Sequence, residues 1–134
     1  MCPQAVKDEV EALAQRGTAV ELVEVGGQCY VLASAIPAPA PPWDRQSYDI
    51  LVAIPAAYDA ASLDAFYLAL PYKFNNGTHP RVQGGIITVK ERQWQLVSWH
   101  YQDGKPWARG LDDLASHLTH CKGFFLHRGA VNAY

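Results

Sequence analysis

The sequence predicts a single α+β domain, residues 1–134, with a helix at each end of a strand-rich middle. Apolar residues recur at helical spacing near both ends of the chain. Between them, alternating and β-branched residues are separated by glycine and proline turns, a pattern typical of antiparallel strands. A chain of 134 residues, 49% apolar and 18% charged, can bury a hydrophobic core without metal or disulfide cross-links.

The first helix is predicted within residues 3–15, where Val6, Val10 and Leu13 fall on one face. Arg16-Gly17 then supplies a cation and a C-terminal glycine, which are typical of a helix end. The polar residues expected to face outward are Lys7, Asp8, Glu11 and Gln15.

Three successive strands are predicted next, over residues 19–25, 28–36 and 48–54. Gly26-Gly27 is a two-residue hairpin signal between the first two strands. Pro55 ends the third strand, because proline cannot donate to a sheet ladder. Short connections between successive strands favour an antiparallel meander.

Residues 85–89 are predicted to complete a four-stranded meander, and residues 94–100 to form a further extended segment. Asn75-Asn76-Gly77 predicts a turn. The stretch around Ser62-Leu63-Asp64 is compatible with either a short helix or a packed loop.

The last predicted element is a second helix, preceded by Asp112 and Asp113, where the positive helix N-terminus favours acids. The residues expected on its apolar face are Leu111, Leu114, Leu118, Cys121 and Phe125.

Charge and hydropathy exclude several partners. The net charge is −2, and no cluster of Lys and Arg that would follow a phosphate backbone is present, so no nucleic acid is expected. No apolar run reaches the ~20 residues that span a bilayer, and the N-terminus lacks an apolar signal region. We therefore expect a cytoplasmic protein without a membrane partner.

The three cysteines are scattered and odd in number, which indicates a reducing compartment rather than a disulfide framework. Cys29 and Cys121 fall in apolar patterns and are predicted to pack in the core, while Cys2 is predicted to lie in a frayed tail. His117 lies one helical turn from Cys121 and close to His120, but no second ligand pair completes a zinc site. No metal and no cofactor are expected.

The segment around Ser98 carries the most suggestive chemistry. If residues 94–100 are extended, Ser98 and His100 share one face, while Val97 and Trp99 point to the other, toward the core. A serine beside a histidine is the minimal arrangement for an activated hydroxyl, and Asp103 lies near enough to orient the imidazole. The alternatives are a half-buried strand with polar residues facing outward, or an independent Ser/His hydrolase; a GxSxG motif is lacking.

Two segments carry a resemblance to a known family: Trp94-Gln95-Leu96-Val97-Ser98-Trp99-His100, and Trp107-Ala108-Arg109-Gly110-Leu111-Asp112-Asp113-Leu114. With the order of helix, meander, proline-bounded turn and C-terminal helix, they resemble the E2 ubiquitin-conjugating (UBC) fold. More closely, they resemble the prokaryotic E2 family E.

The resemblance implies an E1-like activating enzyme and a ubiquitin-like protein as partners, with the E1-like enzyme meeting the first helix. Typical E2 enzymes carry the modifier on a cysteine, but this chain has no cysteine between Cys29 and Cys121. Ser98 is the nucleophile nearest the corresponding position, and His100 is the candidate base. His79-Pro80-Arg81 echoes the His-Pro-Asn motif without its Asn, the usual oxyanion-stabilising residue.

Two readings follow from the resemblance. In one, Ser98 and His100 are catalytic, and Ser98 carries the modifier as an oxyester. In the other, the chain is a catalytically inactive binding module or scaffold. The residues expected to bind the partners are Tyr101, Trp107, Arg109 and Asp112.

Overall fold

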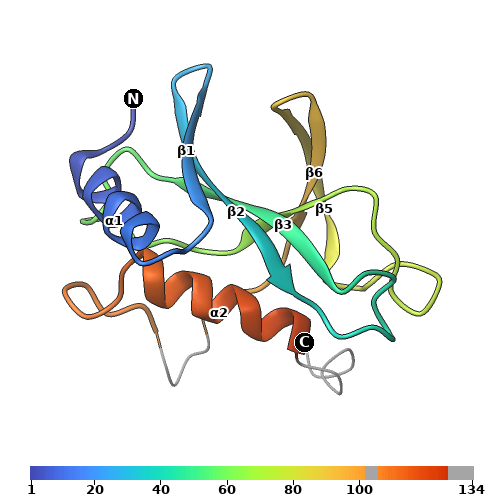
Figure 1. Cartoon of the computed structure of the whole chain (residues 1–134). Coiled ribbons are helices and arrows are strands. Elements are labelled where there is room, and N and C mark those ends of the chain that lie inside the picture. Colours follow the sequence, from blue (N-terminus) through green and yellow to red (C-terminus); the bar gives the residue numbers. More distant parts are fainter. Residues whose placement is uncertain (102–105, 127–134) are drawn as a thin grey trace.

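The computed structural model describes residues 1–101 and 106–126 (Figure 1). Along the described part of the chain, one helix precedes six strands and a second helix follows them, as expected of this α+β domain. The elements are α1 (Gln4–Gln15), β1 (Val20–Val25), β2 (Gln28–Pro37), β3 (Ser47–Ile54), β4 (Phe66–Ala69), β5 (Val82–Val89), β6 (Arg92–Val97) and α2 (Leu114–Leu126).

The first helix is confirmed: Val6, Val10 and Leu13 are buried on one face of α1. The four polar residues predicted to face outward are exposed. Gly17, with a φ of +88°, adopts the left-handed conformation that ends the helix after Arg16.

All neighbouring strands in the sheet are antiparallel, in the order β1-β2-β3-β4-β6-β5. The expected meander of four strands is therefore part of a six-stranded sheet. Its fourth strand is β4, which sequence reasoning left unassigned, and not residues 85–89. Those residues belong to β5, which forms a hairpin with β6, and β6 pairs with β4.

The sheet curls so that its two ends approach each other. Lys90, at the turn between β5 and β6, forms an ion pair with Glu21 on β1, with 3.2 Å between Nζ and Oε1. In Figure 1 the β1–β2 and β5–β6 hairpins rise side by side above the rest of the sheet. A small apolar cluster packs on one face of this curl; it includes the fully buried Trp94, and Arg92 lies over the Trp94 ring.

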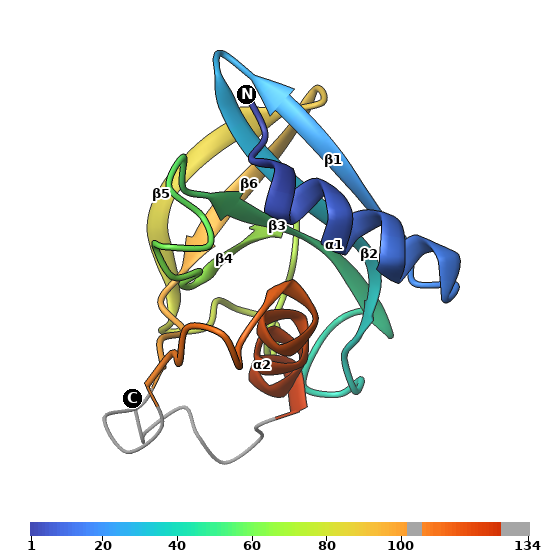
Figure 2. The same cartoon turned by 90° about the vertical axis from the view of Figure 1, so that its left-hand side faces the viewer.

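The main core lies between the sheet and the two helices, both of which contribute buried residues to it (Figure 2). Leu114, Leu118, Cys121 and Phe125 of α2 are buried, as predicted. Leu111 corrects the prediction: it precedes the helix and is 84% exposed, because the chain reaches the helical stripe only at Leu114.

The start of α2 is capped twice. The Ser116 N–H donates to Asp113 Oδ1, and the Asp113 N–H donates to Ser116 Oγ, each at 2.9 Å, which is a reciprocal capping box. Glu9 on α1 supplies a second cap, because its Oε1 accepts the Leu114 N–H at 2.7 Å and the Tyr58 hydroxyl at 2.9 Å. One carboxylate therefore joins α1, the turn after β3 and α2.

Replacing Glu9 with Ala is expected to lower the free energy of unfolding by ~2–3 kcal/mol, because two buried donors lose their acceptor. Glu11→Ala is the matched control, since Glu11 is exposed on the same helix and accepts only a 3.4 Å bond from Gln15. Urea unfolding of both variants measures the difference. Equal losses in the two variants would contradict the role given to Glu9.

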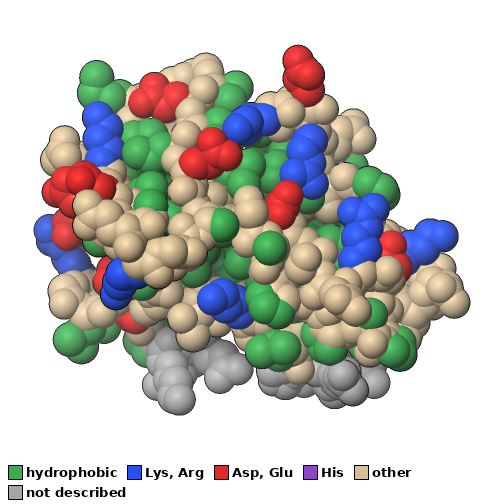
Figure 3. Space-filling view, viewed as in Figure 1, with side chains coloured by type: hydrophobic (Ala, Val, Ile, Leu, Met, Phe, Trp, Pro, Cys, Tyr) green, Lys and Arg blue, Asp and Glu red, His purple; other side chains and the backbone are tan. Residues whose placement is uncertain are grey.

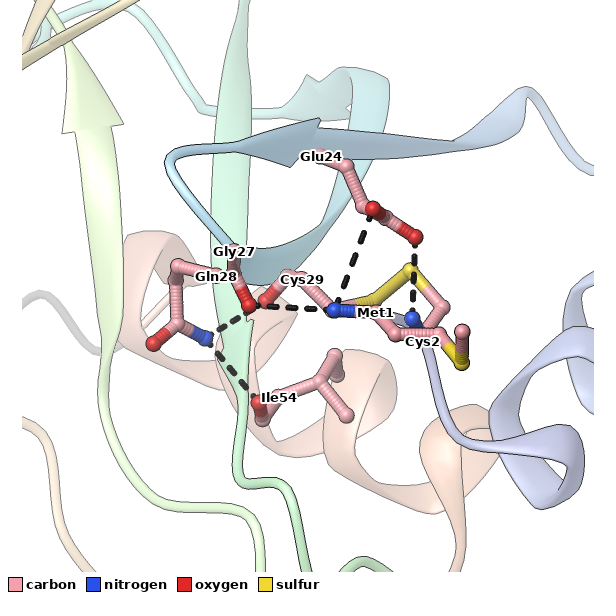
Figure 4. A network of polar contacts seen from close by, with 7 residues as sticks. All are labelled: Met1, Cys2, Glu24, Gly27, Gln28, Cys29 and Ile54. Atoms are coloured by element: carbon pink, nitrogen blue, oxygen red, sulfur yellow. Dashed lines mark hydrogen bonds and ion pairs between the residues drawn. A yellow bond between two sulfur atoms is a disulfide. The ribbon is translucent and has the colours of Figure 1, made fainter.

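The N-terminus corrects two predictions about the cysteines. Cys2 is 5% exposed rather than frayed, and it forms a disulfide with Cys29 on β2. Glu24 accepts the Cys2 N–H at 2.9 Å, and the Met1 amino group donates to the Gly27 carbonyl at 3.1 Å (Figure 4). The cysteine pattern therefore no longer argues for a reducing compartment.

Charges are mixed on the face shown in Figure 3, where Lys and Arg side chains alternate with Asp and Glu. Within the described residues, no helix is both long and apolar enough to cross a membrane.

Candidate functional site

The chain leaves the sheet just before the candidate nucleophile. Strand β6 ends at Val97, and the Trp99 N–H donates to the Val97 carbonyl at 3.0 Å. This bond closes a three-residue γ-turn centred on Ser98. Val97 and Trp99 are buried, as expected, and Ser98 is partly exposed. Because the extended backbone ends at Val97, strand alternation cannot be used to place Ser98 and His100 on one face.

The His79-Pro80-Arg81 segment lies directly beside Ser98, although it is distant in sequence. The Ser98 N–H donates to the Arg81 carbonyl at 2.8 Å. His79 is buried, stacks on Trp43 and accepts the Arg81 N–H on Nδ1 at 3.0 Å. Burial, with a smaller effect of the Arg81 charge, lowers the pKa of His79 to about 4. His79 is therefore a neutral structural residue that fixes the backbone under Ser98.

His100 pairs with a carboxylate that sequence reasoning missed. Its Nδ1 lies 3.0 Å from each carboxylate oxygen of Asp64, in the segment just before β4. Both residues lie on a surface depression of about 540 Å³. Its lining residues are Ser62, Leu63, Asp64, His100, Tyr101, Pro106 and Trp107. Ser98 is described by the structure but does not line this depression.

Beneath the depression, Tyr101 connects to a fully buried histidine. The Tyr101 hydroxyl lies 2.6 Å from His117 Nδ1, and His117 Nε2 lies 2.9 Å from the Ala65 carbonyl. A carbonyl can only accept, so Nε2 carries the proton and Nδ1 accepts the hydroxyl of Tyr101. Burial lowers the pKa of His117 to about 4 and raises the pKa of Tyr101, so both groups are neutral at pH 7.

Aromatic and imidazole rings pack around Tyr101. His120 stacks on it, with 4.1 Å between ring centroids, and Trp99 also stacks on His120, with 5.5 Å between ring centroids. Trp107 meets the Tyr101 ring edge-on and is partly buried against the core. Within the described residues, Trp107 Nε1 and His120 Nε2 are buried without a hydrogen-bond partner.

The remaining predicted binding residues lie on the turn that leads into α2. Arg109 forms an ion pair with Asp59 at 3.5 Å, and both side chains are mostly exposed. Asp112 accepts the Ala108 N–H at 2.7 Å and the Ser116 hydroxyl at 3.2 Å, so it holds the turn together.

The structure thus brings three of the six predicted site residues, His100, Tyr101 and Trp107, to one depression. Ser98 lies on the adjoining turn, and no hydrogen bond joins its hydroxyl to His100 within the described residues. Asp103, the carboxylate expected to orient His100, lies outside the described residues; among the described residues, Asp64 contacts His100. Nothing in the sequence specifically indicated Asp64, which lies in a stretch without clear periodicity.

The cysteines are poorly placed for acyl transfer. Cys121 is fully buried, and burial raises the pKa of its thiol. Cys2 and Cys29 are joined to each other. His117, which could have begun a zinc site, has a hydrogen-bond partner at each of its ring nitrogens. The described part of the chain contains no group of three or more metal-ligating side chains.

The helix–sheet–helix order and the antiparallel sheet are consistent with the UBC-like fold of E2 proteins. A family model described as prokaryotic E2 family E matches residues 5–126. The chain therefore belongs to the prokaryotic E2 family E, as its sequence resemblance indicated. Neither the curated proteins nor the solved structures contain a significant match to it.

Proposed function

We propose that this chain is an E2-like acyl carrier in a bacterial ubiquitin-like conjugation pathway, and that it holds the C-terminal glycine of the modifier as an oxyester on Ser98. The observation that carries the proposal is the contact between His100 and Asp64, on the segment that follows Ser98. A serine hydroxyl is a weak nucleophile at neutral pH, and it needs a nearby base to take its proton.

The proposed step moves an acyl group from a thioester on the E1-like enzyme. Ser98 Oγ attacks the thioester carbonyl, so an O–C bond forms and the C–S bond breaks. The thiolate leaves with the E1-like enzyme, and the proton of the hydroxyl passes to Nε2 of His100. Because Nδ1 of His100 faces the Asp64 carboxylate, Nε2 is the nitrogen left to accept this proton.

A catalytically inactive scaffold for the E1-like enzyme and the ubiquitin-like protein is the second candidate. Two observations favour it: no cysteine is both free and exposed, and no hydrogen bond joins the Ser98 hydroxyl to His100 among the described residues. A scaffold would need only its binding surface, with Tyr101 and Trp107 on the depression and Arg109 and Asp112 on the turn beside it. An independent hydrolase would need a pocket around Ser98, which does not line the depression.

The partner surfaces follow from the family relationship. The E1-like enzyme would meet α1, whose exposed side chains include Lys7 and Glu11. The ubiquitin-like protein would place its C-terminus near Ser98 and the depression. We place this pathway in the cytoplasm, where the activating enzyme has ATP.

The experiment is to incubate the chain with its E1-like enzyme, the modifier and ATP, and to measure intact mass. We expect an adduct of one modifier that survives reducing agent and is cleaved by mild base, as an oxyester would be. A charged E1-like enzyme without any adduct on this chain would reject the carrier and favour the scaffold.

A further inference from the structure

We infer that Asp64 is a positioning residue that holds His100 in the tautomer with its proton on Nδ1. The effect of Asp64 on acyl transfer rests on the proposed function, but its effect on the imidazole does not. An ionised carboxylate only accepts hydrogen bonds, so the imidazole nitrogen 3.0 Å from both of its oxygens must be the donor. Neutral His100 then presents an unprotonated Nε2.

Stability does not account for this contact. The side chains of His100 and Asp64 are 57% and 54% exposed. Ion pairs this exposed add little to the stability of the fold, because water screens them. The contact is better explained by its effect on the His100 imidazole than by a contribution to folding stability.

The backbone beside Asp64 is held in an unfavourable conformation. Ala65 has a φ of +53°, in the left-handed region that is unfavourable for a residue with a Cβ. Such strain persists only where the surroundings impose it, and it concentrates at functional sites. Leu63, on the other side of Asp64, is fully buried.

The buried His117 is the group that holds this segment. It donates from Nε2 to the Ala65 carbonyl, and its Nδ1 accepts the hydroxyl of Tyr101, which follows His100 directly. Two adjacent residues of the loop after β6 are thus tied to two adjacent residues before β4. One tie runs directly from His100 to Asp64, and the other runs from Tyr101 through His117 to Ala65. Together they fix where the carboxylate meets the imidazole.

The test is the tautomer of His100, read from the two-bond nitrogen–proton couplings of ¹⁵N-labelled protein at a pH where the ring is neutral. We expect the wild type to be in the Nδ1–H form and Asp64→Ala to populate both tautomers. Asp64→Glu should retain much of the Nδ1–H form. Glu21→Ala is the matched control, because it removes an exposed ion pair with Lys90 far from His100 and should leave the tautomer unchanged.

The second readout is the rate of adduct formation with the E1-like enzyme, the modifier and ATP. Asp64→Ala should form the adduct ~10–100-fold more slowly, with partial recovery in Asp64→Glu. An unchanged tautomer in Asp64→Ala would overturn the inference, whatever the adduct does. If the tautomer shifts as expected but wild type forms no adduct, the positioning role stands and the carrier function fails.

Discussion

Replacing Ser98 with Ala is expected to abolish the adduct completely, because no other side chain at that turn can carry the acyl group. Ser98→Cys is expected to convert the oxyester into a thioester, which reducing agent cleaves and the wild-type ester resists. His100→Ala should slow adduct formation by ~10²–10⁴-fold, the usual contribution of a positioned base. Intact mass with and without reducing agent measures all three outcomes.

Ser47→Ala is the control for these variants. Ser47 is exposed and is the first residue of β3. The turn that precedes β4 follows the other end of this strand. It should form the adduct at the wild-type rate. An adduct that persists at full yield in Ser98→Ala would contradict the assignment of the nucleophile.

Acidification from pH 7 to pH 4 is expected to destabilise the fold strongly through two buried histidines. The pKa of His117 is about 4 in the folded protein and near ~6.5 when unfolded, so between these values the unfolded chain binds the extra proton. Stability is therefore lost as the pH falls below about 6.5. The loss reaches about 3 kcal/mol for His117 and a similar amount for His79, against a typical total stability of roughly 5–15 kcal/mol.

For each histidine, the structure shows why protonation destabilises the fold. A proton on His117 Nδ1 would break its bond from the Tyr101 hydroxyl, and a proton on His79 Nδ1 would break its bond from the Arg81 N–H. Urea unfolding at pH 7, 6, 5 and 4 measures the slope. His117→Gln should be less stable at pH 7 but should lose less on acidification, because one titrating group is gone. Parallel pH profiles for wild type and His117→Gln would contradict this account.

The parts of the fold that could be predicted are those with a local pattern. Val6, Val10 and Leu13 mark α1, and the Gly26-Gly27 turn fixes the β1–β2 pairing at Val25 and Gln28. Strand β4 was missed because four residues are too few for a clear alternation. Its position between β3 and β6 depends on pairings that no local pattern encodes.

The prediction for the cysteines was wrong for a similar reason. Their spacing in sequence gives no framework, and the bond between Cys2 and Cys29 forms because α1 begins beside the β1–β2 turn. Only the folded arrangement places the two residues 5.0 Å apart, measured between Cα atoms.

The candidate site could be predicted only where its residues are neighbours in sequence. His100 and Trp107 lie in the two segments that carry the family resemblance, and Tyr101 directly follows the first of these segments. Asp64 could not be predicted, because it meets His100 only after β4 pairs with β6. The same-face argument for Ser98 and His100 assumed an extended strand, and the γ-turn at Ser98 ends that strand early.

The most direct test of the central claim is to locate the modifier on the wild-type protein. After the reaction with E1-like enzyme, modifier and ATP, the adduct is digested at acidic pH, which preserves esters, and the peptides are sequenced by tandem mass spectrometry. The account predicts that the C-terminal remnant of the modifier is attached to Ser98 and is released by mild base. A base-stable remnant on a lysine, or a thiol-sensitive remnant on a cysteine, would contradict it.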